Sequence, residues 1–163
     1  MYGPTLLSQN AVFPTRVSAD GSPLYKAAGV TIDWGGIIAP LSDVTLGDGS
    51  IIKAGQKYIR YGQVITMITA SLKYAPYDPA LTNGRETLAR GRAFIVDETV
   101  LEFGGGTALL SPKNDHIGGV FDGGRAWLDR IIQSGTGSAS LAAGPTFANL
   151  ILTFPLLQLV REE

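Results

Sequence analysis

The single histidine of the chain and two nearby aspartates are the residues most able to do chemistry. His116 directly follows Asp115, and Asp122 lies six positions further on. An imidazole beside carboxylates can transfer protons or hold a metal ion. The sequence has no second histidine and no cysteine to complete a typical zinc set. Because Pro112 and Gly118 flank the histidine, we expect a surface turn here, without catalysis or metal binding.

Other chemical motifs are incomplete in the same way. The glycines at 104–106 lack the Gly-Lys-Ser/Thr ending of a phosphate-binding loop, and no serine lies in a Gly-x-Ser-x-Gly nucleophile elbow. Asp33, Asp43 and Asp48 lack the close alternating spacing of calcium ligands, so they are expected to cap turns. We therefore expect a protein that is not an enzyme and that needs no metal or cofactor.

Arg85, Arg90 and Arg92 form the one basic cluster of the sequence. Two interpretations stay open: a solvated loop, or a surface whose guanidinium groups pair with the carboxylates of a partner. Three cations are too few for nucleic-acid binding, and the formal net charge of −1 adds no attractive field. The sequence therefore predicts no nucleic-acid partner.

Length and composition limit the size of the fold and the setting in which it works. A chain of 163 residues suits one ordinary domain, and its low charged fraction of 17% fits either an all-β, loop-rich chain or a surface partly covered by partners. The N-terminus lacks a basic segment followed by an apolar one, and the apolar run at 150–160 is too short to span a bilayer. We expect synthesis in the cytoplasm and no membrane partner.

Short apolar segments separated by turn residues indicate strands. Asp48-Gly49, between β-forming residues at 44–46 and 51–52, predicts a hairpin. Segment 126–133 fits one or two helical turns or a strand, and 145–152 fits a short helix with proline in its first turn. Other strands are expected at 58–61, 64–69, 93–96, 120–121 and 156–160. The pattern is mainly β and predicts a small β-barrel or a sandwich, of which we favour the barrel, with one or two short helices.

The division of the chain follows from where this pattern begins and ends. Residues 1–28 show no sustained periodicity and are expected to form an extended N-terminal arm, 29–133 the barrel core, and 134–163 a C-terminal extension packing on the same domain. The arm is either a frayed terminus or a segment that adds to an exposed strand edge of a partner. Its unusually apolar positions, which would make that contact, are Leu6, Leu7, Val12 and Phe13.

Segment 64–84 carries a resemblance to a known family. A strand ends in Thr69-Ala70-Ser71, and the loop Lys73-Tyr74-Ala75-Pro76-Tyr77-Asp78-Pro79-Ala80 follows and is closed by Gly84. This resembles the core segment of lambda-type phage head decoration (capsid cement) proteins. A weaker similarity lies in Gly123-Gly124-Arg125-Ala126-Trp127-Leu128. The chain departs from the family at Leu72, where a glycine would be typical, and in its basic segment 88–92.

The resemblance implies a structural protein of the virion. Such a protein binds the major capsid protein on the capsid exterior of the expanded head, commonly as a homotrimer at three-fold axes, and stabilises the shell against internal DNA pressure. It would be made in the host cytoplasm. We expect the trimer or capsid interface to include Tyr74, Pro76, Tyr77, Asp78 and Arg85, because rigid amphipathic side chains are enriched at interface cores.

Alternatives remain for these residues and for the function. Tyr74, Pro76 and Tyr77 could instead pack within their own protomer. The chain could also be a tail, baseplate or receptor-binding β-barrel of the virion, with glycan binding through Trp34 or Trp127. A β-barrel hydrolase is a further alternative, which would need a cluster of carboxylates around His116.

Overall fold

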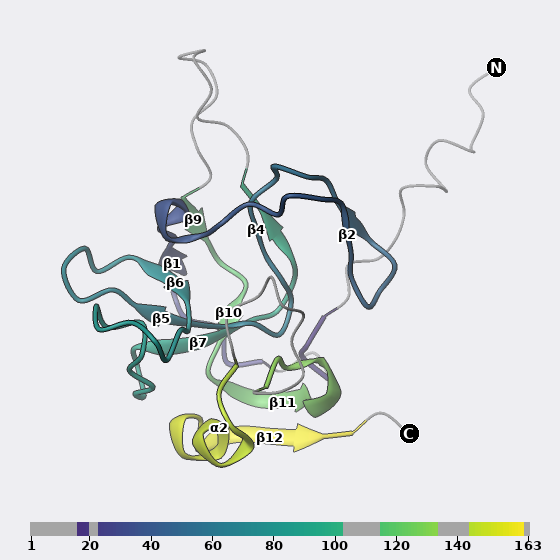
Figure 1. The fold of residues 1–163 in the computed structure, drawn as a ribbon. Coiled ribbons are helices and arrows are strands. Elements are labelled where there is room, and N and C mark those ends of the chain that lie inside the picture. Colours follow the sequence, from purple (N-terminus) through teal and green to yellow (C-terminus); the bar gives the residue numbers. More distant parts are fainter. Residues whose placement is uncertain (1–15, 20–22, 103–114, 134–143, 162–163) are drawn as a thin grey trace.

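The computed structural model describes residues 16–19, 23–102, 115–133 and 144–161. The expectation of a mainly β chain with one or two short helices is confirmed, since one α-helix and two single-turn 3-10 helices accompany the strands in these ranges. The strands fall into one four-stranded sheet and four two-stranded ladders, and among the described residues no closed barrel is traced (Figure 1).

The elements follow one another closely along the chain. In order they are β1 (Val30–Thr31), η1 (Trp34–Gly36), β2 (Val44–Thr45), β3 (Ile51–Ile52), β4 (Tyr58–Ile59), β5 (Val64–Met67), β6 (Tyr74–Pro76), β7 (Ala93–Val96), β8 (Val100–Leu101), β9 (His116–Ile117), β10 (Val120–Phe121), β11 (Gly123–Trp127), η2 (Leu128–Arg130), α2 (Phe147–Thr153) and β12 (Leu156–Val160). The expected hairpin at 44–52 is present as the β2–β3 pair.

The central sheet has the strand order β10-β7-β5-β6 and is antiparallel throughout. Val64 pairs with Ile95 and Ile65 with Phe94, and all four side chains are buried. Because successive residues of a strand point to opposite faces, the first pair joins one apolar cluster and the second pair joins another. The sheet is therefore covered on both faces, as the continuous apolar character of the Val64 strand predicts.

The C-terminal part of the chain adds a second layer against this sheet. β11 and β12 are parallel and pair from Gly123–Leu156 to Trp127–Val160, with α2 in the connection between them. The strand alternative for segment 126–133 thus applies up to Trp127, and η2 forms the helical turn after it. α2 begins after Thr146, whose hydroxyl accepts a hydrogen bond from the amide of Asn149. Pro145 therefore precedes the cap instead of lying in the first turn.

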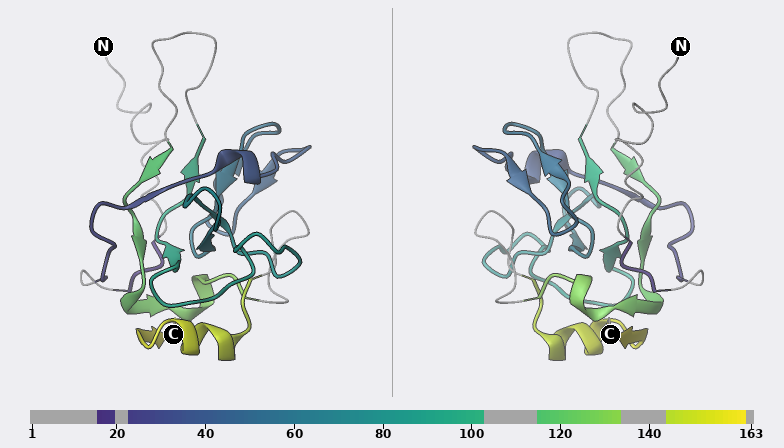
Figure 2. Two further views of the ribbon diagram at one scale, coloured as in Figure 1. Left: turned by 90° about the vertical axis from the view of Figure 1, so that its left-hand side faces the viewer. Right: turned by 90° about the vertical axis from the view of Figure 1, so that its right-hand side faces the viewer.

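The described part of the N-terminal segment lies along β10 and β11 (Figure 2). Ser18 bridges Ala126, and Tyr25 bridges Phe121, both in antiparallel fashion. Val17 is fully buried in the same apolar cluster as Ala126 and as Leu150 of α2. Residues 16–19 and 23–28 are thus bound to the chain's own strands, although the sequence led us to expect an arm from residue 1 to residue 28.

Turn residues behave largely as their types predict. The carboxylates of Asp33, Asp43 and Asp48 accept hydrogen bonds from the amides of Gly35, Ala54 and Ser50, so their expected capping role is confirmed. Leu72 is an exception, since it has φ +58° in the turn between β5 and β6. That left-handed conformation favours glycine over a residue with a Cβ atom.

Gly62 occupies a position that no side chain can share. Its φ is +77°, and a Cβ atom at this position would overlap the carbonyl oxygen of Arg130. Its amide donates to Val96 and its carbonyl accepts from Ile132, which fixes the backbone between β7 and the end of η2. The close approach therefore joins the central sheet to the segment that follows β11.

We predict that Gly62→Ala lowers the free energy of unfolding by more than about 3 kcal/mol, because the methyl group forces two hydrogen-bonded backbone segments apart. Gly55→Ala is the matched control, since Gly55 has φ +81° and open space around it. Gly55→Ala should lower the free energy of unfolding by only about 1–2 kcal/mol, because alanine is strained in the left-handed conformation. Urea unfolding measures both values, and equal losses for the two variants would contradict the close approach.

Candidate functional site: the Asp97 anchor

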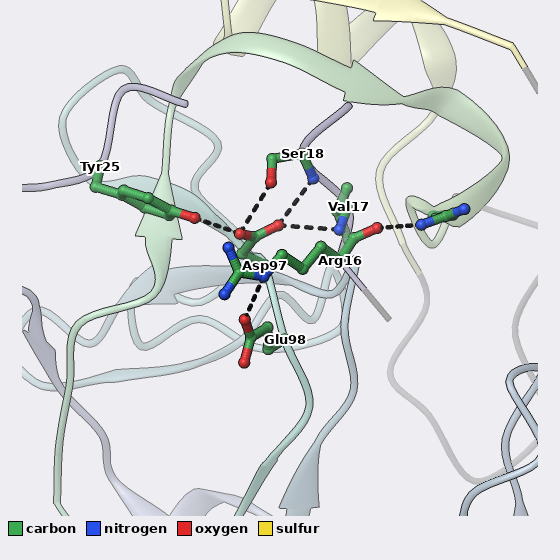
Figure 3. Close-up of polar contacts among 7 residues, drawn as sticks. Arg16, Val17, Ser18, Tyr25, Asp97 and Glu98 are labelled. Atoms are coloured by element: carbon green, nitrogen blue, oxygen red, sulfur yellow. Dashed lines mark hydrogen bonds and ion pairs between the residues drawn. The ribbon is translucent and has the colours of Figure 1, made fainter. Parts of the chain in front are cut away.

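Asp97 directly follows β7 and binds the N-terminal segment with both of its carboxylate oxygens (Figure 3). One oxygen accepts from the amides of Val17 and Ser18 at 2.9 and 2.8 Å. The other accepts from the Ser18 hydroxyl at 3.1 Å and from the phenol of Tyr25. Asp97 is only 1% exposed. A single buried side chain therefore connects β7 to two separate points of the N-terminal segment.

The environment of Asp97 explains why this arrangement is stable. A buried carboxylate is costly unless hydrogen bonds replace its lost hydration, and here donors reach both oxygens. Hydrogen bonds to a charged group each contribute about 1.5–3 kcal/mol, more than those between neutral groups. The backbone reinforces the contact, because the amide of Val17 also donates to the Asp97 carbonyl at 3.1 Å. The segment and the carboxylate thus satisfy each other.

Tyr25 is the donor most sensitive to pH. Partial burial raises the pKa of Tyr25 above its usual 10.0, and Asp97 raises it further because it accepts the phenol's hydrogen bond and repels a phenolate. Since the folded-state pKa is above the unfolded one, the contribution of this bond is complete below pH 10.0 and is lost as the pH rises through the raised value. The ring also packs edge-on against Phe121.

Arg16 marks the beginning of the described N-terminal segment. Its guanidinium lies 2.6 Å from the carboxylate of Glu98, and its carbonyl accepts from Arg130 at 2.6 Å. The Arg16–Glu98 pair is largely exposed and contributes little to stability by itself. Together with the bonds of Asp97, these contacts hold Arg16, Val17 and Ser18 on the body.

A groove of about 600 Å³ lies beside the anchor and is lined by Arg16, Tyr25, Asp97, Glu98, Thr99, Val100, Ile117, Gly118 and Gly119. Protein donors reach both carboxylate oxygens of Asp97, so this side chain has a structural role as an acceptor. Within the described ranges, no three or more His, Asp or Glu side chains gather as a metal site, and no helix is long and apolar enough to cross a membrane. The arrangement can hold a segment in place.

The residues that the sequence placed at an interface are mostly internal. Tyr74, Pro76, Tyr77 and Arg85 are buried in their own protomer, and Asp78 is half-buried with its carboxylate accepting from the amide of Ala80. The burial favours the alternative of packing within the protomer for the two tyrosines and the proline, and their place at a trimer or capsid interface stays a prediction. The arm residues Leu6, Leu7, Val12 and Phe13 lie outside the described residues.

Arg85 has a structural role that neither interpretation of the basic cluster anticipated. Its guanidinium donates to the carbonyls of Pro76 and Gly36 at 2.8 and 3.2 Å, so it joins the loop after β6 to η1. Burial lowers the pKa of Arg85, and the nearby carboxylates of Asp78 and Asp33 partly oppose this shift. The cluster is therefore not one solvated loop or one ion-pairing surface.

The positions of His116 and the two tryptophans bear on the expectations for these residues. His116 lies in β9, paired with Thr31, so the expected surface turn is wrong, although its side chain is exposed. Trp34 is 2% exposed and belongs to the core, which removes it as a platform for glycans. Trp127 is half-buried in β11, with the Arg130 guanidinium 5.7 Å from its ring.

Sequence reasoning did not identify Asp97, Ser18 or Tyr25 as site residues. The available signal was local: Asp97 follows the fully buried strand β7 without a turn residue between them. An aspartate at such a point must find donors inside the fold. Its partners lie 72–80 positions away, however, so the sequence does not show which residues they are.

Comparisons of the chain with protein families, with curated proteins and with solved structures found no match. The functional argument therefore rests on the residues and on their geometry.

We predict that Asp97→Ala lowers the free energy of unfolding by about 3–5 kcal/mol, because it leaves buried donors without an acceptor. Trypsin should then cut the native protein faster after Arg16 and Lys26. Asp97→Asn keeps one carbonyl oxygen for the amides of Val17 and Ser18. Its free energy of unfolding should therefore lie between those of wild type and Asp97→Ala.

Asp43→Ala is the control, since Asp43 is an exposed aspartate paired with Lys53 on a hairpin. It should leave the urea midpoint and the trypsin rate nearly unchanged. If Asp97→Ala behaved like Asp43→Ala, the anchor would be refuted.

Proposed function

We propose that this chain is a phage capsid decoration protein that binds the outer surface of the expanded head and stabilises it against internal DNA pressure. The observation that carries the proposal is the anchor at Arg16 and Asp97. It fixes the chain at Arg16 and Val17, directly after the 15 residues that include Leu6, Leu7, Val12 and Phe13. A cement protein needs a rigid body and a segment that reaches the major capsid protein.

The segment that resembles decoration proteins supports the same function. β5, the left-handed turn at Leu72 and β6 form a hairpin in the central sheet, and Arg85 holds the loop that follows it. This rigid centre suits a protein that resists mechanical load and turns nothing over. In the proposal the chain works as a homotrimer at three-fold axes of the virion and is made in the host cytoplasm.

A capsid-binding experiment tests the proposal. Empty expanded capsids assembled from the major capsid protein encoded in the same genome are mixed with the full chain, with a variant lacking residues 1–15, and with a variant whose residues 1–15 are a Gly/Ser sequence of equal length. We expect the full chain to sediment with capsids and both variants to bind at least about tenfold more weakly, because the apolar contacts are gone. Both variants should keep the melting temperature of the full chain, since the anchored residues are intact.

The outcomes separate the parts of the proposal. Cryo-electron microscopy of the bound full chain should show density on the outer surface at three-fold positions. If the full chain does not bind expanded capsids at all, the decoration function fails. If it binds and the two variants bind equally well, the function stands and the role of residues 1–15 fails.

A further inference from the structure

The segment from Pro145 to Val160 is unusual because it contains no charged residue, although much of it faces solvent. Only a few of its side chains turn toward the body, chiefly Leu150, Thr153 and Phe154, which are buried. A surface helix ordinarily carries its polar residues on the outer side. In α2 the exposed residues are apolar except for Asn149, which is unusual for a helix surface that faces water.

The exposed apolar side chains belong to α2 and to the first residue of β12, two elements that follow each other along the chain. Phe147 and Ile151 are one helical turn apart, Leu152 follows directly, and Leu156 opens β12. Their exposed fractions are 47%, 48%, 79% and 53%. α2 and β12 make up the outer layer at this end, beyond β11 (Figure 1). We call this surface, formed by the four residues, the α2–β12 face.

β12 adds an open backbone edge to the face. It pairs with β11 on one side, and within the described residues no strand pairs with its other side. Natural edge strands are usually protected by charged residues or proline within the strand. β12 consists of four apolar residues and Gln158, so it lacks that protection. Such an edge is suited to contact with another chain.

We propose that the α2–β12 face binds a second copy of this chain. The argument is one of area. With about 150–200 Å² for each fully exposed large apolar side chain, the four residues expose about 350–450 Å². A standard interface covers about 800 Å² per partner, of which somewhat more than half is apolar. The face therefore supplies most of the apolar centre of one interface of ordinary size.

The rim of the face fits a copy of itself. A groove of about 330 Å³ beside α2 is lined by Tyr77, Glu86, Leu88, Arg90, Asn149, Leu152 and Thr153. Glu86 and Arg90 bring both signs of charge to this rim. When two copies meet, each carboxylate can face the partner's guanidinium, which a partner of one charge sign would not allow. An apolar centre with a mixed polar rim is the usual composition of interfaces between identical chains.

This inference goes beyond the proposed function, because a face that meets its own copy joins two chains about a two-fold axis, whereas neighbours in a homotrimer ring meet through two different faces. Of the interface residues expected from the sequence, Tyr77 lines the groove beside this face.

Sedimentation velocity on the full chain, without capsids, tests the inference. We expect wild type to be a dimer at about 10–100 µM, and Leu152→Glu to be monomeric with at least about a hundredfold weaker association, because a desolvated charge would lie in the apolar centre. Leu41→Glu is the matched control, since Leu41 is fully exposed away from this face. It should associate as wild type does.

A second variant guards against misfolding. Phe147→Glu places an acidic residue in the first turn of α2, where it favours the helix, and it should also yield a folded monomer. A monomeric wild type would overturn the inference, and so would variants at Leu152 and Phe147 that associate like wild type. Because no capsid is present, failure here leaves the decoration function standing, and failure of capsid binding leaves this result standing.

Discussion

The buried carboxylate of Asp97 is the contact on which the rest of the structure depends. It directly follows the buried strand β7, and its hydrogen bonds position Val17, Ser18 and Tyr25 against β10 and β11. Without these donors the carboxylate would be desolvated and unsatisfied, and without the carboxylate their amides and hydroxyls would be. This mutual dependence makes the N-terminal segment part of the body from Arg16 onward.

The same region unites parts of the chain that are distant in sequence. Val17, Ile95, Ala126 and Leu150 belong to one apolar cluster, so the N-terminal segment, the central sheet, β11 and α2 share a core. Displacing any one of them would expose the others.

Much of the secondary structure could be predicted, because its signals are local. The Asp48-Gly49 hairpin, the strand at 93–96 and the last strand at 156–160 follow from turn chemistry and apolar runs of the right length. The Asp97 anchor could not be predicted from the sequence, because the donors to its carboxylate come from residues far away along the chain. Tyr74 and Tyr77 were ambiguous for a different reason: an amphipathic aromatic suits an interface and a core equally, and only tertiary packing decides between them.

Native-state hydrogen exchange tests the central claim, that residues 16–28 belong to the body, most directly. The amides of Val17, Ala19, Leu24 and Lys26 donate to backbone carbonyls of other segments. They should therefore be protected to within about tenfold of the β7 amides, since they open with the same core. Exchange of these four amides at the rate of an unstructured peptide, while β7 stays protected, would show that the segment is detached in solution and would contradict the account.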